Sequence, residues 1–579
     1  MGFKKENNFL KLILILSIFG LIVARFFYLD RFPVGMSHDE IEYILSGKTY
    51  FLSGVDLSNT PFPKSIFQTK TEGIISFLPA VILSPYYGLV SINQFTVRLP
   101  YVFINLLTAY VLYLLIKKLF EDKTFALIST IIFLANPWSF YLSRTASDTA
   151  FALLFYLLGI FFILDNSRKK IFLSFIFFTL GFFAYHGAKV ILIPMVLVCV
   201  LYRRFWTKYK LNLKTTILFF TGILVVFTIY FFGNKLYPNS INQSRSKDII
   251  FLNQDLVSPI VDTDRKAAIE NPFKNIFVNK ATITLRIFAQ KYLTAFSPDV
   301  LFAFGDNRAT YRFGQHGLFF IIDFVFIFIG LINLFNKYPK KTKFLILLIL
   351  ISPLSTAVNT IETSVINRSF LLLPLLIILL SFGIYTCFKF LSITIGHVFS
   401  FLILFLVILF SFINFFVFYF FQLPVVGQEN FFFSQHLIAN YIFRNDDRKI
   451  IIVDMEPRLI FLESVFYSPK NQNLVLKDFV KNQNYQFNNV TFTSICPKEY
   501  AIDTTYIIKN SFLNCINHKD GLKSINEEQF GGPLYYIIND SLCSSFPSQP
   551  WLRFHLVKDY LPEKLDNYNF CQTWIKSFN

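Results

Sequence analysis

A cluster of acidic residues follows the first apolar segment of the chain and offers the clearest chemistry in the sequence. Its acids are Asp39, Glu40 and Glu42, with His38 and Tyr43 beside them. Carboxylates in such a position can accept a proton, cap a helix or share a cation. A metal site made of His38, Asp39 and Glu40 is the weaker hypothesis, because adjacent side chains rarely point together and the sequence has no Cys/His spacing typical of a zinc site.

The composition places these residues in an integral membrane protein. Of the 579 residues, 54% are hydrophobic and 16% are charged, with a mean hydropathy of +0.51, whereas an ordinary soluble protein is much less apolar. Apolar stretches near the ~20 residues that cross a bilayer recur along the chain. We predict about eleven transmembrane helices, at 9–28, 98–117, 124–141, 148–164, 171–185, 187–202, 215–232, 317–335, 344–360, 369–387 and 398–421.

Basic residues between the predicted spans give the orientation, because Lys and Arg are retained on the cytoplasmic side of short loops. They cluster in alternate connections, at Lys117–Lys123, Arg168–Lys170, Arg203–Lys214 and Lys337–Lys343. The N-terminus is therefore predicted to be cytoplasmic, and the net charge of +18 indicates membrane topology rather than nucleic-acid binding. The apolar piece from Ile74 to Leu89 contains two prolines and is predicted to be a juxtamembrane element of the first external loop.

The composition changes after Gln422. Residues 422–579 are polar with strand-like runs at 449–453 and 535–538, which predicts a small soluble α/β domain outside the membrane. The transmembrane domain is then residues 1–421, with external loops at about 29–97 and 233–316 that contain juxtamembrane helices. The C-terminal segment contains Cys496, Cys515, Cys543 and Cys571. In an exported domain these permit two disulfides of undetermined pairing, and an intracellular domain with four free thiols is the alternative.

The acidic cluster, with Gly54-Val55-Asp56 after it, resembles the first external loop of the C-type glycosyltransferases, in particular the protein O-mannosyltransferase and aminoarabinose-transferase branch. Four further motifs resemble that branch in the expected order: Arg98-Leu99-Pro100; Asn136-Pro137-Trp138 through Arg144 to Asp148; Tyr292–Phe302 with Gly305, Asp306 and Arg312; and Pro353–Ala357 with Asn367, Arg368 and Pro374. Together the motifs extend over most of residues 20–385.

The resemblance implies a multi-span α-helical glycosyltransferase of a bacterial plasma membrane. Such an enzyme takes a sugar from a polyprenyl-phosphate donor of the undecaprenyl type and transfers it to an acceptor outside the cytoplasm, a protein, lipid or cell-surface glycan. By the resemblance Asp39 is the general base, and Glu40 caps, orients the acceptor or shares a cation. A single displacement with one base predicts inversion at the anomeric carbon. No nucleotide-binding glycine motif occurs in the sequence.

The departing phosphate gains negative charge, so cationic side chains on external connections are its expected ligands. In order of preference these are Arg368, Arg144, Arg312 and Lys70. Arg144 and Arg368 have an alternative role as side chains that reach from a span end to the interface. Lys70 and Glu72 lie where the aminoarabinose enzymes have a Glu-Lys-Pro-Pro segment, but this chain lacks the two prolines. Tyr43, Glu72, His38 and His316 are assigned as substrate-contacting residues.

Two other classes of protein compete with the enzyme. A transporter or flippase of lipid-linked glycans would place functional charges at mid-membrane and show internal repeats, whereas the acids of this chain concentrate in the external loops. A sensor or scaffold would need fewer crossings. The expected partners are the bilayer, the lipid-linked donor and the external acceptor, without nucleic acid. No cofactor is assigned, and a divalent cation stays an alternative.

Overall fold

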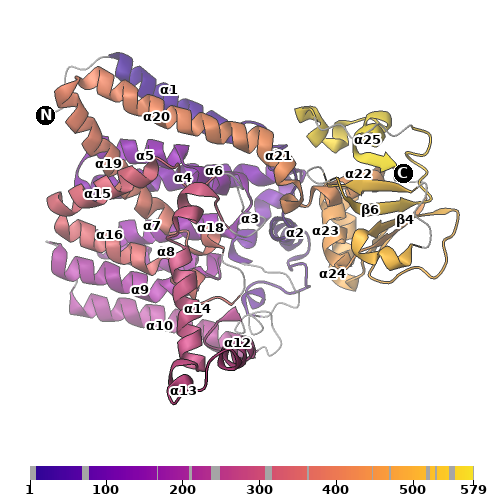
Figure 1. Ribbon diagram of the computed structural model, residues 1–579, viewed down its shortest axis with the longest axis horizontal. Coiled ribbons are helices and arrows are strands. Elements are labelled where there is room, and N and C mark those ends of the chain that lie inside the picture. The colour runs from indigo at the N-terminus through magenta and orange to yellow at the C-terminus, as the bar shows by residue number, and fades with distance from the viewer. Residues whose placement is uncertain are drawn as a thin grey trace.

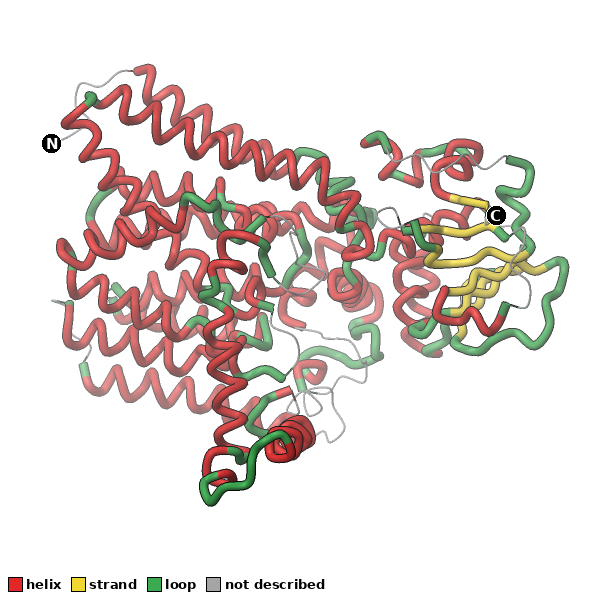
Figure 2. The backbone as a smooth tube through the Cα atoms, viewed as in Figure 1, coloured by secondary structure: helices red, strands yellow, loops and turns green. Residues whose placement is uncertain are grey.

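The computed structural model describes residues 8–67, 77–165, 167–207, 212–236, 248–306, 316–360, 364–445, 448–468, 471–516, 522–527, 531–546 and 555–577. Most of these residues are helical. The strands gather at one end of the molecule, beside a larger body of long helices (Figure 1). Figure 2 shows the same division, with the yellow strands confined to the C-terminal region.

Each predicted span coincides with at least one helix. These helices are α1 (Asn8–Phe26), α4 (Gln94–Phe120), α5 (Lys123–Ala135), α6 (Pro137–Arg144), α7 (Asp148–Ile163), α8 (Arg168–Ala184), α9 (Ala188–Leu201), α10 (Leu213–Leu236), α15 (Asp323–Lys337), α16 (Pro339–Ile351), α19 (Leu372–Thr394) and α20 (His397–Val417). Among the described residues, four helices are long and apolar enough to cross a bilayer alone: α4, α10, α19 and the helix 397–426 that begins with α20. A fifth is added if α5 and α6 form one bent span. The count of eleven crossings stays a prediction.

The predicted span at 124–141 is broken rather than continuous. The axes of α5 and α6 differ by 62°, with Asn136 between them. Asn136 is extended, as is usual before proline, and its side chain accepts a hydrogen bond from the backbone N–H of Ser139 at 3.2 Å. The Asn136-Pro137 pair therefore ends one helix and caps the next, which the span prediction did not anticipate.

Two glycines bring α15 and α19 into backbone contact. A Cβ atom on Gly330 would lie 1.8 Å from the carbonyl oxygen of Leu379, and one on Gly383 would lie 1.9 Å from that of Phe326. Small residues let apolar helices approach closely where no hydrophobic effect drives them together. This contact holds α19 against α15. Helix α19 begins shortly after Arg368 in the chain.

Short helices occur in both predicted external loops. The first loop contains α2 (His38–Ser53) and α3 (Phe77–Leu89), and the second contains α12 (Gln254–Lys266), α13 (Lys274–Phe277) and α14 (Lys280–Thr294). Two more, α17 (Leu354–Ala357) and α18 (Val365–Arg368), connect α16 to α19. In Figure 1, α14 runs steeply across the direction of α9 and α10. Whether α3 lies at the bilayer surface, as predicted for residues 74–89, stays a prediction.

The C-terminal region contains a seven-stranded mixed sheet. Its strands are β1 (Lys449–Val453), β2 (Gln486–Phe487), β3 (Val490–Thr493), β4 (Thr504–Lys509), β5 (Lys523–Asn526), β6 (Pro533–Ile538) and β7 (Ile575–Ser577). Their order is β2-β3-β1-β4-β6-β5-β7, with β1 parallel to β3 and β4 and the other pairs antiparallel. The strands predicted at 449–453 and 535–538 are β1 and β6. The cysteines pair as Cys496–Cys515 and Cys543–Cys571.

Helices join this sheet to the rest of the molecule. They are α21 (Leu423–Val426), α22 (Phe433–Arg444), α23 (Pro457–Tyr467) and α24 (Gln472–Asn482). A further helix, α25 (Asn567–Trp574), contacts β7 of the sheet. Helices α23 and α24 lie between the sheet and α2 (Figure 1) and contact α2 directly. One cluster of buried apolar side chains extends from the long helices into the C-terminal region. The segment after Gln422 is therefore packed against the helical body, beside the acidic cluster.

Candidate active site

A buried arginine holds the segment between α1 and α2. Arg98 of α4 is fully buried, and its guanidinium donates to the carbonyl oxygens of Leu29 at 3.3 Å, Pro33 at 3.0 Å and Gly35 at 2.5 Å. A buried carbonyl without a partner costs about 1–3 kcal/mol. The Arg98 side chain thus allows this irregular backbone to lie inside the protein and fixes where α2 begins.

The first turn of α2 is closed by a reciprocal cap. The Ser37 hydroxyl accepts from the N–H of Glu40, and Glu40 Oε2 accepts from the N–H of Ser37 at 2.8 Å. The other carboxylate oxygen, Oε1, accepts from the N–H of Ala146 at 2.6 Å. Glu40 therefore ties α2 to the connection between α6 and α7. Capping is one of the three roles that the sequence allowed for Glu40. Its side chain also lines the cavity described next, so a direct part for Glu40 in catalysis stays a prediction.

A cavity of about 430 Å³ opens beside the first turn of α2. Its wall comes from α2, the α6–α7 and α8–α9 connections, α10, and the region of α17 and α18. Acidic and basic side chains both line it: Asp39, Glu40, Asp148 and Asp248 on one hand, Lys189 and Arg368 on the other. Tyr43, Tyr141, Tyr185, His186, Tyr230, Asn359 and Asn367 are also in the wall. The cavity can thus hold an anionic group together with a group that gives up a proton.

Hydrogen bonds connect several of these side chains. The Tyr43 hydroxyl donates to Asp148 Oδ2 at 3.1 Å, which joins α2 to the start of α7. Lys189 Nζ lies 3.3 Å from His186 Nδ1 and 5.0 Å from the centre of the Tyr230 ring. The ammonium is therefore held at the cavity wall by a ring nitrogen and an aromatic face.

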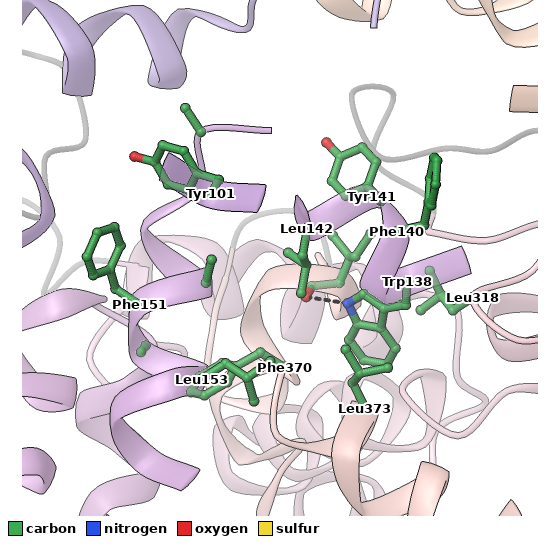
Figure 3. Packing of buried hydrophobic residues seen from close by; sticks show 14 of the residues in the cluster. Tyr101, Trp138, Phe140, Tyr141, Leu142, Phe151, Leu153, Leu318, Phe370 and Leu373 are labelled. Carbon is green, nitrogen blue, oxygen red and sulfur yellow. Dashed lines mark hydrogen bonds between the residues drawn. The ribbon is translucent and has the colours of Figure 1, made fainter. Parts of the chain in front are cut away.

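The connection that ends at Arg368 is anchored from two sides. Trp138 of α6 is fully buried and its indole donates to the carbonyl oxygen of Ile366 at 3.0 Å, the dashed line in Figure 3. The N–H of Ile366 in turn donates to Asp306 Oδ2 at 2.8 Å. Figure 3 also shows Trp138 beside the apolar side chains of Leu318 and Leu373. The backbone of α18 is thereby fixed, and Arg368 extends from it into the cavity wall.

Residues 76–231 match the family described as dolichyl-phosphate-mannose-protein mannosyltransferase. The structure of ArnT from Cupriavidus metallidurans in the apo state superposes with a TM-score of 0.52 and 10% sequence identity, over 91% of this chain and 98% of that one. The chain has the C-type glycosyltransferase fold. ArnT of the same organism bound to undecaprenyl phosphate gives a TM-score of 0.48 at 10% identity, with the same coverage of both chains. The apo oligosaccharyltransferase of Archaeoglobus fulgidus gives 0.43 at 11% identity, over 93% of this chain and 75% of that one. No curated protein sequence matches the chain significantly.

Within this C-type glycosyltransferase fold, the structure brings together part of the predicted site. Asp39 and Tyr43 from the first external loop and Arg368 from the connection before α19 line the same cavity. Asp148, the last residue of the motif that begins at Asn136, lines it as well. Lys70, Glu72 and Arg312 lie outside the residues that the structure describes.

The structure does not bring Arg144 to the cavity, although the sequence predicts it as a ligand of the donor phosphate. Arg144 is fully buried outside the cavity wall, and its guanidinium donates to four backbone carbonyls near the end of α1, including those of Arg25 and Phe32 at 2.8 Å each. In the sequence, Arg144 occupies a position near the end of a predicted span, as Arg368 does. Its bonds instead hold the loop that leads to α2.

The two histidines assigned to substrate also lie outside the cavity wall. His38 Nε2 is 3.0 Å from Gln435 Oε1 and its ring stacks on Phe432, so this side chain faces the C-terminal region. Burial lowers the pKa of His38 to about 4, which keeps the ring neutral. His316 is buried among aromatic rings, and its Nδ1 lies 2.9 Å from the carbonyl oxygen of Gly317.

The Gly-x-Asp part of the motif has a structural role. Asp56 is fully buried, and its Oδ1 accepts from the N–H groups of Ser58 and Thr60 at 2.8 Å each, which closes a turn. Burial raises the pKa of Asp56 to about 6, against the opposing effect of these bonds and of the Arg458 charge. Asp56 therefore shapes the first external loop rather than the cavity.

Two charged cavity residues, Lys189 and Asp248, were not predicted. A pattern in the sequence could have revealed Lys189. It lies at the predicted outer end of a span, whereas the clusters of basic residues in this chain lie in the predicted cytoplasmic loops. Asp248 precedes the strand-like contact of Ile249 with Asn359, which only the folded chain brings about. Among the described residues, no group of three or more His, Cys, Asp or Glu side chains is placed to hold a metal ion.

Proposed function

We propose that this protein is a membrane glycosyltransferase that moves a sugar from a polyprenyl-phosphate carrier to an acceptor outside the cytoplasm. The single observation that carries the proposal is that Asp39, Lys189 and Arg368, from three separate elements, line one cavity. The fold and the mannosyltransferase match over residues 76–231 support the same class of reaction. We take undecaprenyl phosphate as the carrier, because we propose that the protein lies in a bacterial plasma membrane.

The chemistry is a single displacement. The Asp39 carboxylate removes the proton of the acceptor hydroxyl or amine as that atom attacks the anomeric carbon. The bond between the anomeric carbon and the phosphate oxygen breaks, and its electron pair leaves with the polyprenyl phosphate. Arg368 and Lys189 stabilise the charge that develops on that phosphate, Arg368 through paired N–H donors. One base and one displacement invert the anomeric configuration.

The proposed topology follows from this reaction. The donor lies in the bilayer with its sugar at the outer interface, so the cavity belongs on the outer side. Residues 1–421 then form a transmembrane domain of about eleven crossings with a cytoplasmic N-terminus, and residues 422–579 lie outside the cytoplasm. The two disulfides of the C-terminal region support that location, because disulfides persist in oxidising compartments.

The test uses purified protein in nanodiscs with a panel of radiolabelled undecaprenyl-phosphate sugars and membrane extracts as acceptors. We expect one donor to be consumed and its sugar to appear on an acceptor with inverted configuration at the anomeric carbon, read by NMR of the product. A protein that binds and consumes no polyprenyl-phosphate sugar would overturn the proposal. Passage of a glycolipid across the bilayer without transfer would instead establish a flippase.

A further inference from the structure

The C-terminal region contacts one side of the segment that carries Asp39. At Gly35 a Cβ atom would lie 2.1 Å from the carbonyl oxygen of Phe431, so the two backbones touch. At His38 the ring stacks on Phe432 and hydrogen bonds to Gln435. These contacts come from the residues just before α22 and from its first turn.

The next contact on that side of α2 is an ion pair. Arg458 of α23 donates from Nη1 to Glu42 Oε1, and the Glu42 side chain is 2% exposed. Residues four apart lie on one face of a helix, so His38 and Glu42 face the C-terminal region together. Asp39 and Tyr43 form the adjacent pair at the same spacing, and both line the cavity. A rotation of α2 about its axis that broke the contacts of His38 and Glu42 would therefore also move Asp39 and Tyr43.

The Arg458 contact is the charged one of the three. His38 is neutral, because burial lowers its pKa, and Gly35 makes only a backbone contact. A buried carboxylate needs a cation or hydrogen-bond donors, and Glu42 takes such a partner from an element 416 residues away in the chain. The orientation of α2 thus depends on a residue outside the transmembrane helices.

We propose that Arg458 is a positioning residue for sugar transfer: through Glu42 it fixes the rotation of α2 and so the place of the Asp39 carboxylate in the cavity. This inference rests on the proposed function. Arg458 does not line the cavity, so its effect falls on the geometry of proton removal rather than on donor binding. The C-terminal region is on this account part of the catalytic apparatus.

The test compares Arg458→Met, Arg458→Lys and the double variant Glu42→Gln/Arg458→Met with wild type. Arg458→Met removes the Arg458 charge from the buried Glu42 carboxylate and should lower stability as well as activity. The double variant removes both charges, so its melting temperature should return toward that of wild type. Its kcat should stay roughly 10- to 100-fold lower with a donor KM within about twofold of wild type, the pattern of a misplaced group. Arg458→Lys should recover part of kcat.

The control is Arg448→Met, which alters the same kind of side chain in the C-terminal region. Arg448 donates to the carbonyls of Ile502 and Asn539 at 3.4 Å each, and not to α2. The Arg448→Met variant should keep the wild-type kcat. A double variant that folds and turns over like wild type would overturn the inference, and so would equal losses in kcat and donor affinity. Absence of transfer by the wild-type protein would instead contradict the proposed function itself.

Discussion

Basic side chains have different roles in two neighbouring regions of this protein. Beneath the first external loop, Arg98 and Arg144 are fully buried and donate to backbone carbonyls. In the cavity beside it, Arg368 and Lys189 line the wall together with Asp39. The buried set holds a loop in place, and the cavity set is proposed to handle the substrate. Residue type therefore does not separate the two regions, whereas the bonding partners do.

Loss of Arg144 is expected to have the largest effect on stability. Arg144→Met would remove the guanidinium hydrogen bonds to four carbonyl oxygens near the end of α1, at about 1–3 kcal/mol for each oxygen that is then buried without a partner. The Tyr28 oxygen keeps the N–H groups of Arg31 and Phe32 as donors. We expect little folded protein in detergent, measured by size-exclusion chromatography and thermal unfolding. A variant that melts near the wild-type temperature would remove the structural assignment and return Arg144 to the list of phosphate ligands.

Loss of Arg368 should show the opposite pattern. Arg368→Met changes a side chain at the cavity wall, so the melting temperature should move little while kcat falls roughly 100- to 1,000-fold, as for other groups that stabilise a developing anion. The measurement is steady-state transfer with a saturating donor. Lys341→Met, on the predicted cytoplasmic side, is the matched control and should be silent. Full activity in Arg368→Met would erase the distinction between the two regions.

A smaller effect is expected where α2 meets the C-terminal region. The pKa of His38 is about 4 in the folded protein and near its ordinary 6.5 when unfolded, so the unfolded chain binds the proton first as the pH falls. Stability due to neutral His38 is complete above pH 6.5 and is lost toward pH 4, by about 2 kcal/mol at pH 5. The melting temperature should therefore fall further between pH 7.5 and pH 5 for wild type than for His38→Asn. Equal drops would place His38 in a wetter environment.

The sequence was sufficient for the helical fold and for selecting Asp39, Tyr43 and Arg368, which the folded chain brings to one cavity, because ordered motifs of a known family and apolar spans of bilayer length are local patterns. Their roles in transfer stay predictions. It could not separate Arg144 from Arg368, since each is a single arginine near a span end and only their partners in the folded chain differ. The break at Asn136 was readable from the following proline, yet the length of the apolar run concealed it. The pair of Glu42 with Arg458 joins distant elements, so no local pattern indicates it.

The most direct test of the central claim is the single-turnover rate of Asp39→Asn with the donor bound. If the Asp39 carboxylate removes the acceptor proton, transfer should slow by roughly 100- to 10,000-fold while donor affinity stays near that of wild type. Asp262→Asn, on the exposed part of α12, should transfer at the wild-type rate. An Asp39→Asn protein that transfers sugar as fast as wild type would show that the base lies elsewhere.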